Sequence, residues 1–409
     1  MTEMTQLDSG VKNSNAEGAQ TKEVLLNLGP QHPSTHGVLR LVMQMEGEKI
    51  VDLDVIIGYL HRGNEKLCES FTYTQIIPLT DRLDYLCQPS NNLAYVRAVE
   101  KLLGIEAPER GQYIRVMMTE LSRISGHLLI SGALPMDLGA ITTLLYVMRE
   151  REMIMDLMEM ATGARMHSSY IRVGGIREDL PEGFTERMQE FCHIFRQRMA
   201  DYETLVAKNR MFLKRTKGIG VITAEEAIDW GLSGPCLRAS GVDWDLRRDN
   251  PYEVYDRLQF KVIVREGGDC YDRWRCRMDE MLESLNMIEQ CLAQMPSDGP
   301  VKVDIPQIAF PGDKAKVQSS MESLIHQFQL SAYGFKVPAG EAYSSIEAPK
   351  GELGFYIISD GSEKPFRVKI RAPSFVNLQV LNAIAKRCYL ADVIAIVGSL
   401  DPVMKEVDK

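Results

Sequence analysis

Residues 114–128 read IRVMMTELSRISGHL, and their apolar side chains recur at helical spacing. Ile114, Met118 and Leu121 fall on one face of a helix, and Leu128 continues that face. The same spacing recurs in three other stretches, residues 93–102, 142–160 and 278–292. We therefore predict a bundle of long core helices between about residues 80 and 335.

Two β-hairpins are predicted outside these helices. Residues 38–45 and 50–57 are apolar segments on either side of the turn sequence EGEK, and the first of them alternates apolar and other residues. Residues 353–359 and 366–370 flank DGSEK in the same way. The expected fold class is α+β and predominantly α-helical, with a small N-terminal β-sheet and a C-terminal mixed α/β segment.

The chain divides into four expected regions. Residues 1–22 are polar and acidic without an apolar core, unlike a signal or transit peptide, and we expect a flexible tail. Residues 23–75 form a β-rich region, residues 76–340 the central helix bundle, and residues 341–409 a mixed C-terminal region. A length of 409 residues fits two or three lobes at about 100–200 residues per domain.

Composition excludes several classes of protein. Apolar residues make up 45% and charged residues 25%, which is typical of a folded globular chain. The net charge of −9 argues against broad nucleic-acid binding, so we expect no nucleic-acid partner. No apolar run approaches the length of a membrane span, so any membrane role is peripheral. The eight cysteines form no C-x-x-C pair, which favours reduced thiols and argues against an iron–sulfur cluster in this chain.

Familiar cofactor motifs are missing. Gly218-Ile219-Gly220 stops short of a dinucleotide fingerprint, and no Walker A or G-x-S-x-G sequence occurs. His32 and His36 have i, i+4 spacing, but Pro33 lies between them and the acidic residue of a metalloprotease motif is absent. The 22 methionines are interpreted as core filler rather than as a cofactor groove.

Three polar residues stand in positions where chemistry is possible. An imidazole on the Pro- and Gly-rich loop 29–37 is a candidate proton donor, or else only a hydrogen-bonding group of the loop. Tyr85 is either a polar donor or an aromatic anchor. Asp137 follows an apolar segment, so its carboxylate is either buried beside a partner or the N-cap of a helix.

Four motifs in order along the chain carry a family resemblance: GPQHPSTHG (29–37), IGYLHRGNEK (57–66), DRLDY (81–85) and GARMH (163–167). They resemble the D subunit of respiratory complex I, the proton-pumping NADH:quinone oxidoreductase. Further matching blocks are IRVGG (171–175), SSMES (319–323), GELG (351–354) and LDPVM (400–404). The resemblance extends from about residue 23 to residue 409.

The wider family includes the large subunit of nickel–iron hydrogenases, which implies a hydrogenase-like central bundle. Four cysteines hold the metal in those enzymes. The corresponding positions here are Asp84, Cys87, Val403 and Glu406, so only one of the four thiolates is present. Because nickel and iron sites of that type need thiolates, we expect no bound metal and no hydrogenase activity.

The resemblance implies that the vacated metal cavity has become the head-group end of a quinone tunnel. The quinone contacts fall on His36 and Tyr85, and Asp137 is the carboxylate that orients the histidine. These three are the expected catalytic residues. Arg62, Glu65 and His167 are expected near the neighbouring subunit, either fastening the interface or tuning electron transfer. The chain itself is expected to bind no cofactor.

The implied partners are other subunits of complex I, above all the subunit with the terminal four-iron cluster, the C subunit and the membrane subunit at the quinone entrance. FMN and NADH would bind elsewhere in the complex. The expected location is peripheral, on the cytoplasmic side of a bacterial inner membrane. Two alternatives stay open, an assembly scaffold without quinone chemistry and the equivalent subunit of a ferredoxin-fed relative.

Overall fold

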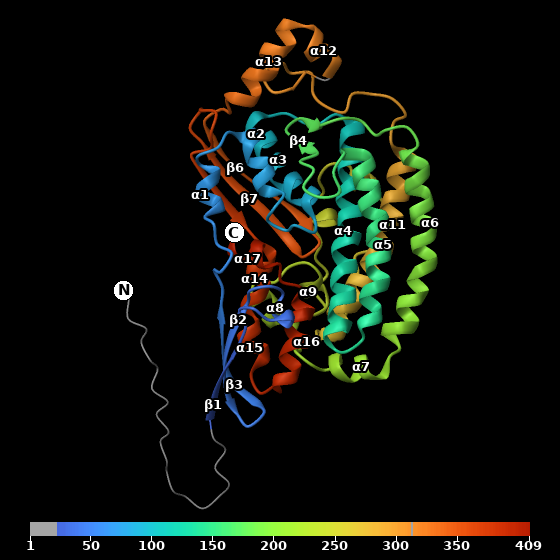
Figure 1. Cartoon of the computed structure of the whole chain (residues 1–409), viewed down its shortest axis with the longest axis vertical. Coiled ribbons are helices and arrows are strands. Elements are labelled where there is room, and N and C mark those ends of the chain that lie inside the picture. Colours follow the sequence, from blue (N-terminus) through green and yellow to red (C-terminus); the bar gives the residue numbers. More distant parts are fainter. Residues whose placement is uncertain (1–22, 312–313) are drawn as a thin grey trace, which may run out of the picture.

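The structure is a computed structural model that describes residues 23–311 and 314–409. The tail expected at residues 1–22 lies outside the described residues. The predicted α+β, predominantly helical class is confirmed: long helices stand side by side in one half of the molecule, and small antiparallel sheets lie in the other half (Figure 1). The division into regions stays a prediction.

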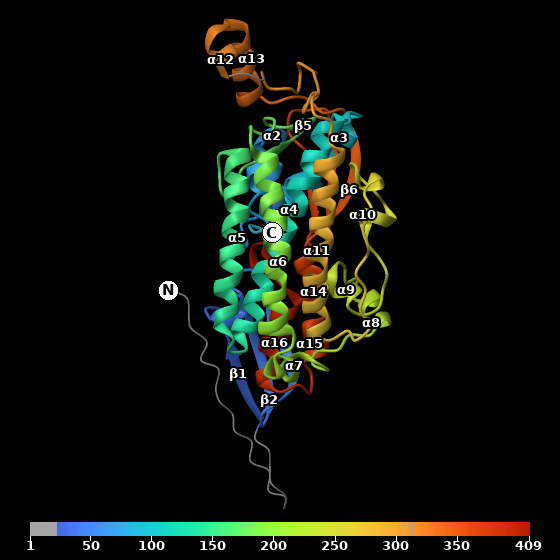
Figure 2. The same cartoon turned by 90° about the vertical axis from the view of Figure 1, so that its right-hand side faces the viewer.

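Four long helices form the bundle, which Figure 2 shows nearly parallel to one another: α4 (Glu109–Asp137), α5 (Ile141–Thr162), α6 (Phe184–Tyr202) and α11 (Cys270–Gln294). Helix α4 packs against both α5 and α11. Its predicted apolar face is confirmed, since Ile114, Met118 and Leu121 are fully buried. Met281 and Met287 of α11 are also fully buried, as core methionines were expected to be.

The N-terminal sheet consists of β1 (Glu23–Leu28), β2 (Arg40–Glu46) and β3 (Lys49–Ile56), all antiparallel. The predicted hairpin is therefore confirmed. Its turn places Glu46 opposite Lys49, with Gly47 in the left-handed region at φ 64°. Leu41 and Met43 point to the core at period two, as the alternating pattern requires.

The C-terminal sheet has three strands in the order β6 (Gly340–Ala348), β7 (Gly351–Ser359), β8 (Arg367–Arg371). The predicted pairing of β7 with β8 is confirmed, whereas β6 was not anticipated. Helix α3 (Gln88–Leu103) packs across β6 and β7 (Figure 1), and its Tyr95 ring meets Phe355 edge-on at 5.7 Å between ring centroids.

The remaining elements are short. Before the bundle lie α1 (Asn64–Cys68) and α2 (Tyr73–Thr80). Between α5 and α11 lie β4 (Ile171–Arg172), β5 (Gly175–Ile176), α7 (Arg210–Thr216), α8 (Ala224–Asp229), α9 (Pro235–Arg238) and α10 (Leu246–Asp249). After the last sheet come α14 (Pro373–Gln379), α15 (Leu381–Ala385), α16 (Leu390–Leu400) and α17 (Met404–Asp408).

Helices α12 (Lys314–Ser319) and α13 (Met321–Ala332) project away from the body at one end of the molecule (Figures 1 and 2). Within residues 23–311 and 314–409, no helix has the length and apolar character needed to cross a membrane.

Candidate functional site

The histidine loop is folded tightly before β2. A single 3₁₀ turn (Pro33–Thr35) occupies its centre, and Thr35 donates its hydroxyl to the carbonyl oxygen of His32 at 2.8 Å. His36 follows in the left-handed conformation, φ 51°. The residue is half-buried. Its Nε2 atom is buried, has no hydrogen-bond partner among the described residues, and lies 3.8 Å from where a Cβ on Gly398 would lie. The loop therefore turns an imidazole nitrogen inward, toward the end of α16.

Tyr85 lies in the connection between α2 and α3. The preceding residue, Asp84, is buried and accepts a hydrogen bond from the Leu86 amide at 3.0 Å, which fixes this turn. The Tyr85 side chain is 36% exposed, and no group in the described part of the chain hydrogen-bonds its hydroxyl. Partial burial, with the charge of Asp84 next to it, raises the pKa of Tyr85. The hydroxyl is thus a protonated donor without an acceptor.

A buried lysine lies among the former metal-ligand positions. Lys350, in the turn between β6 and β7, has its Nζ 3.3 Å from Asp84 Oδ2 and 3.4 Å from Asp401 Oδ2. Its charge also acts on Cys87 and Glu406. Although burial opposes the charged form, Asp401 and Asp84 hold the pKa of Lys350 well above its usual value.

The other former ligand positions have ordinary partners. Cys87 donates its thiol to the Ser122 carbonyl at 3.4 Å, and burial raises the pKa of that thiol. Ser374 donates its hydroxyl to Glu406, while the backbone amide of Val403 donates to the Ser374 hydroxyl at 3.3 Å. Burial, together with the charge of Asp84, raises the pKa of Glu406 to about 7. The structure therefore places three of the four positions, Asp84, Cys87 and Glu406, near Lys350, while Val403 lies beside Ser374.

No group of three or more His, Cys, Asp or Glu side chains within residues 23–311 and 314–409 is arranged to hold a metal ion. The expectation that this chain binds no metal stays a prediction.

Asp137 is the last residue of α4, so its reading as a helix N-cap was wrong. The helix continues through Pro135, because the Ser131 carbonyl that this proline cannot bond receives the indole N–H of Trp274 at 3.3 Å. Burial raises the pKa of Asp137 to about 6, and the charge of His32 opposes that rise. The charges that act on His36 come instead from Asp401 and Lys350. The two histidines of the loop thus have different acidic neighbours.

The three residues expected near a neighbouring subunit, Arg62, Glu65 and His167, have contacts of their own within the chain or are exposed. Arg62 is exposed. Glu65 accepts the backbone amide of Ile370 at 3.0 Å and so fastens α1 to β8. His167 lies with Nδ1 3.2 Å from the carbonyl oxygen of Asp81. The structure does not bring these three side chains to His36 and Tyr85, and their interface role stays a prediction.

Two residues of the buried cluster, Lys350 and Arg277, were not predicted from the sequence. A third, Asp401, was named only as part of the LDPVM motif. Arg277 Nε lies 3.8 Å from Asp401 Oδ2. Lys350 stands in a Pro-Lys-Gly turn, where a lysine is ordinarily solvent-exposed, so the local sequence carried no signal for its burial.

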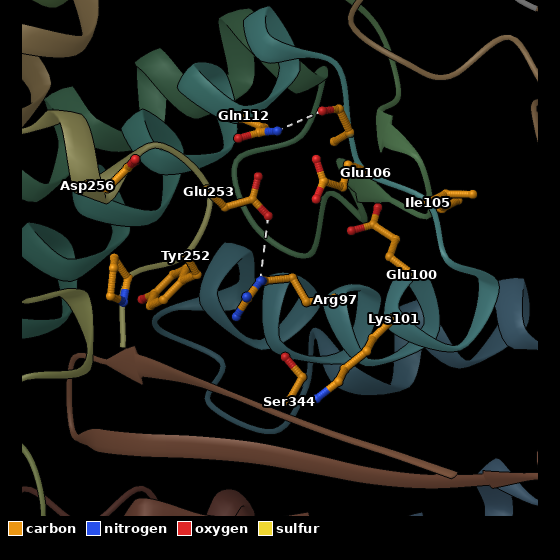
Figure 3. Close-up of a pocket in the computed structure, with 12 residues that line it drawn as sticks. Arg97, Glu100, Lys101, Ile105, Glu106, Gln112, Tyr252, Glu253, Asp256 and Ser344 are labelled. Atoms are coloured by element: carbon orange, nitrogen blue, oxygen red, sulfur yellow. Dashed lines mark hydrogen bonds and ion pairs between the residues drawn. The ribbon is translucent and has the colours of Figure 1, made fainter. Parts of the chain in front are cut away.

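A separate cavity of about 460 Å³ lies between the C-terminal half of α3 and the start of α4 (Figure 3). Arg97 in this cavity stacks over Tyr252, 4.6 Å from its ring centroid, and pairs with Glu253 at 3.8 Å. Neither His36 nor Tyr85 lines it. This cavity is therefore distinct from the candidate site.

The fold and site together define a class of protein: a mainly helical α+β protein with a buried lysine ammonium between Asp84 and Asp401. Comparison with known proteins gives the family. The family model described as respiratory-chain NADH dehydrogenase, 49 kDa subunit, matches residues 137–409. The chain belongs to this family and is a subunit of NADH-quinone oxidoreductase, respiratory complex I, as the sequence motifs predicted.

Three relatives, all named as D subunits of NADH-quinone oxidoreductase, illustrate the extent of the similarity. The D 2 subunit of Rhizobium meliloti is 72% identical over 409 residues and is matched over its whole length. The D subunit of Geotalea uraniireducens is 54% identical over 391 residues, covering 96% of this chain and all of the relative. The D 2 subunit of Koribacter versatilis is 51% identical over 393 residues, covering 96% and 98% of the two chains. Other complex I subunits are therefore partners of this chain.

Proposed function

We propose that this subunit forms the quinone-reduction site of its complex, together with the neighbouring subunit that carries the terminal four-iron cluster. One observation carries the proposal. His36 Nε2, which is buried with no hydrogen-bond partner among the described residues, and the partly exposed Tyr85 hydroxyl both lie near the buried Lys350–Asp84–Asp401 cluster. Groups left without partners in an otherwise bonded structure are suited to a ligand that supplies acceptors.

The chemistry of quinone reduction matches these two groups. A quinone takes up two electrons and two protons to become a quinol, and negative charge develops on its carbonyl oxygens as electrons arrive. Tyr85 and His36 would each donate a hydrogen bond, and then a proton, to one carbonyl. The raised pKa of Tyr85 keeps its proton in place until that charge arrives.

Asp137 would link the site to proton translocation. Loss of a proton from the histidine loop changes the charge balance at a carboxylate whose pKa, near 6, lies close to neutral pH. Such a change in charge can shift a conformational equilibrium, and that shift would be transmitted to the membrane subunits. The structural support is the placement of Asp137 beside His32.

The proposed assembly follows from this role. Electrons from NADH would pass through FMN and iron–sulfur clusters held elsewhere in the complex. The C subunit and the membrane subunit at the quinone entrance would lie against this chain, which would sit peripherally on the cytoplasmic side of a bacterial inner membrane. Arg62, Glu65 and His167 would contribute to the contact with the cluster-bearing subunit.

Photolabelling tests the location of the site. An azido-substituted short-chain quinone, irradiated with the assembled complex, is expected to modify peptides that contain His36 or Tyr85. Excess unmodified quinone should suppress that labelling. Labelling confined to other subunits, with the same protection by quinone, would contradict the proposal and favour an assembly scaffold.

Asp137→Asn should remove a pH dependence of quinone reduction. In the wild-type complex the carboxylate loses its charge as the pH falls through about 6, so the rate should fall there because the negative charge beside the histidine loop is lost. The variant should be roughly 3- to 10-fold slower at pH 7.5, below the about 10²- to 10⁴-fold effect of a direct proton donor, because Asp137 acts through the histidine loop. Rates measured from pH 5 to 8 check this. An unchanged midpoint in the variant would assign the titration to another group.

A further inference from the structure

The ammonium of Lys350 is buried, and no group within residues 23–311 and 314–409 accepts a hydrogen bond from it. Its side chain is 1% exposed, and the contacts with Asp84 and Asp401, at 3.3 and 3.4 Å, do not have hydrogen-bond geometry. A lysine ammonium has three N–H donors. Leaving them unused in a protein interior is costly, so the position is suited to an additional acceptor.

Three neighbouring atoms are unpartnered as well: Asp401 Oδ2, Arg277 Nε and His36 Nε2. Arg277 Nε and Lys350 Nζ lie 3.8 and 3.4 Å from the same Asp401 oxygen. Donors and an acceptor without partners thus meet at one place. An oxygen-bearing occupant, either water or a ligand carbonyl, would satisfy these donors.

This place adjoins the candidate head-group site. Asp84, which pairs with Lys350, directly precedes Tyr85. Gly126 keeps the space open, because a Cβ there would lie 2.5 Å from Cys87 Sγ and 3.7 Å from Lys350 Nζ. The ammonium therefore lies near Asp84 and Cys87, two of the positions that the resemblance matches to metal-binding cysteines.

We propose that Lys350 supplies the fixed positive charge of the quinone head-group site, standing where a metal cation would otherwise lie. This inference rests on the proposed function. The ammonium keeps its proton and no bond to it breaks. The quinone gains its two electrons through the complex and its two protons from Tyr85 and His36, while Lys350 stabilises the negative charge that develops between those events. It also positions Asp84, and through Asp84 the turn that presents Tyr85.

Lys350→Met tests the inference in membranes containing the assembled complex. We expect NADH oxidation with a short-chain quinone to fall by about 10-fold or more, mainly through kcat, since the lost interaction strengthens as charge develops. Reduction of ferricyanide, which takes electrons before the quinone site, should be retained. Lys101→Met is the matched control, because Lys101 Nζ donates to the Tyr343 carbonyl at the surface, away from the candidate site. Full quinone reduction by Lys350→Met would overturn the inference.

Chemical rescue separates charge from packing. In Lys350→Ala, ethylammonium should restore quinone reduction several-fold, whereas tetramethylammonium, which has a charge but no N–H, should not. Restoration by both cations or by neither would overturn the role assigned to the ammonium.

If Lys350→Met does not assemble, a charge-balanced double variant still tests the inference. Asp84→Asn combined with Lys350→Met removes one charge of each sign and leaves Asp401 beside Arg277. Assembled double variant with slow quinone reduction supports the inference, and wild-type rates contradict it. If Tyr85→Phe loses quinone reduction and Lys350→Met does not, only this inference fails. If both variants retain it, the proposed site itself is wrong.

Discussion

Tyr85→Phe should reduce quinone-dependent NADH oxidation by about 100-fold, in the range for loss of a positioned proton donor. The substitution removes one hydroxyl and keeps the aromatic ring. Because no described group hydrogen-bonds that hydroxyl, its loss leaves no protein partner unsatisfied, and the fold should be unaffected. Membranes normalised for assembled complex would be assayed with a short-chain quinone and, separately, with ferricyanide.

Ferricyanide reduction should remain at the wild-type level, which places the defect at the quinone end of an intact electron path. Tyr333→Phe provides the control, since Tyr333 is 66% exposed after α13 and the same hydroxyl is removed there. Equal quinone rates in Tyr85→Phe and wild type would make Tyr85 an aromatic anchor and deprive the proposed site of one of its two donors.

The sequence predicted the elements whose side-chain period is regular. Helix α4 was found because Ile114, Met118 and Leu121 repeat at helical spacing, and the β2–β3 hairpin because Leu41 and Met43 alternate. Strand β6 was missed because it buries a charged residue, Glu347, where an apolar one would mark a core strand. The cost of burying Glu347 is offset by groups far away in sequence, chiefly Arg238, which donates to it at 2.7 Å.

The candidate site was predictable only where a motif carried it. The motifs supplied His36, Tyr85 and the four positions matched to metal ligands, and the structure brings Asp84, Cys87 and Glu406 near one point. They did not supply the group at that point, because the burial of Lys350 depends on Asp84 and Asp401 approaching from other segments. Pairings of this kind are tertiary and leave no local pattern. The structure of this chain does not test the role predicted for Arg62, Glu65 and His167, because the partners that would define that role are other subunits.

Arg238→Met should nearly eliminate the assembled complex. Arg238 is fully buried, and its guanidinium donates to Glu280 at 3.0 Å and to Glu347 at 2.7 Å, with Asp245 at 3.6 Å. Methionine has a similar length but no charge, so the buried carboxylates of Glu280 and Glu347 would lose their main counter-ion. Removing one partner of a buried ion pair costs about 3–5 kcal/mol. That is a large share of a typical folding free energy of about 5–15 kcal/mol.

The expected result is assembled complex at less than about a tenth of the wild-type amount, since even 1–2 kcal/mol changes abundance several-fold. Native gels of solubilised membranes, probed for this subunit, measure it. Arg248→Met is the matched control: Arg248 pairs with Asp243 and Asp249, but at the surface, where an ion pair contributes about 0–1 kcal/mol. Each variant loses an arginine that pairs with carboxylates, so a difference in the amount of assembled complex between them reports the effect of burial. Wild-type abundance of Arg238→Met would mean that Glu280 and Glu347 become protonated at little cost, and that the buried ion pairs do not stabilise this fold.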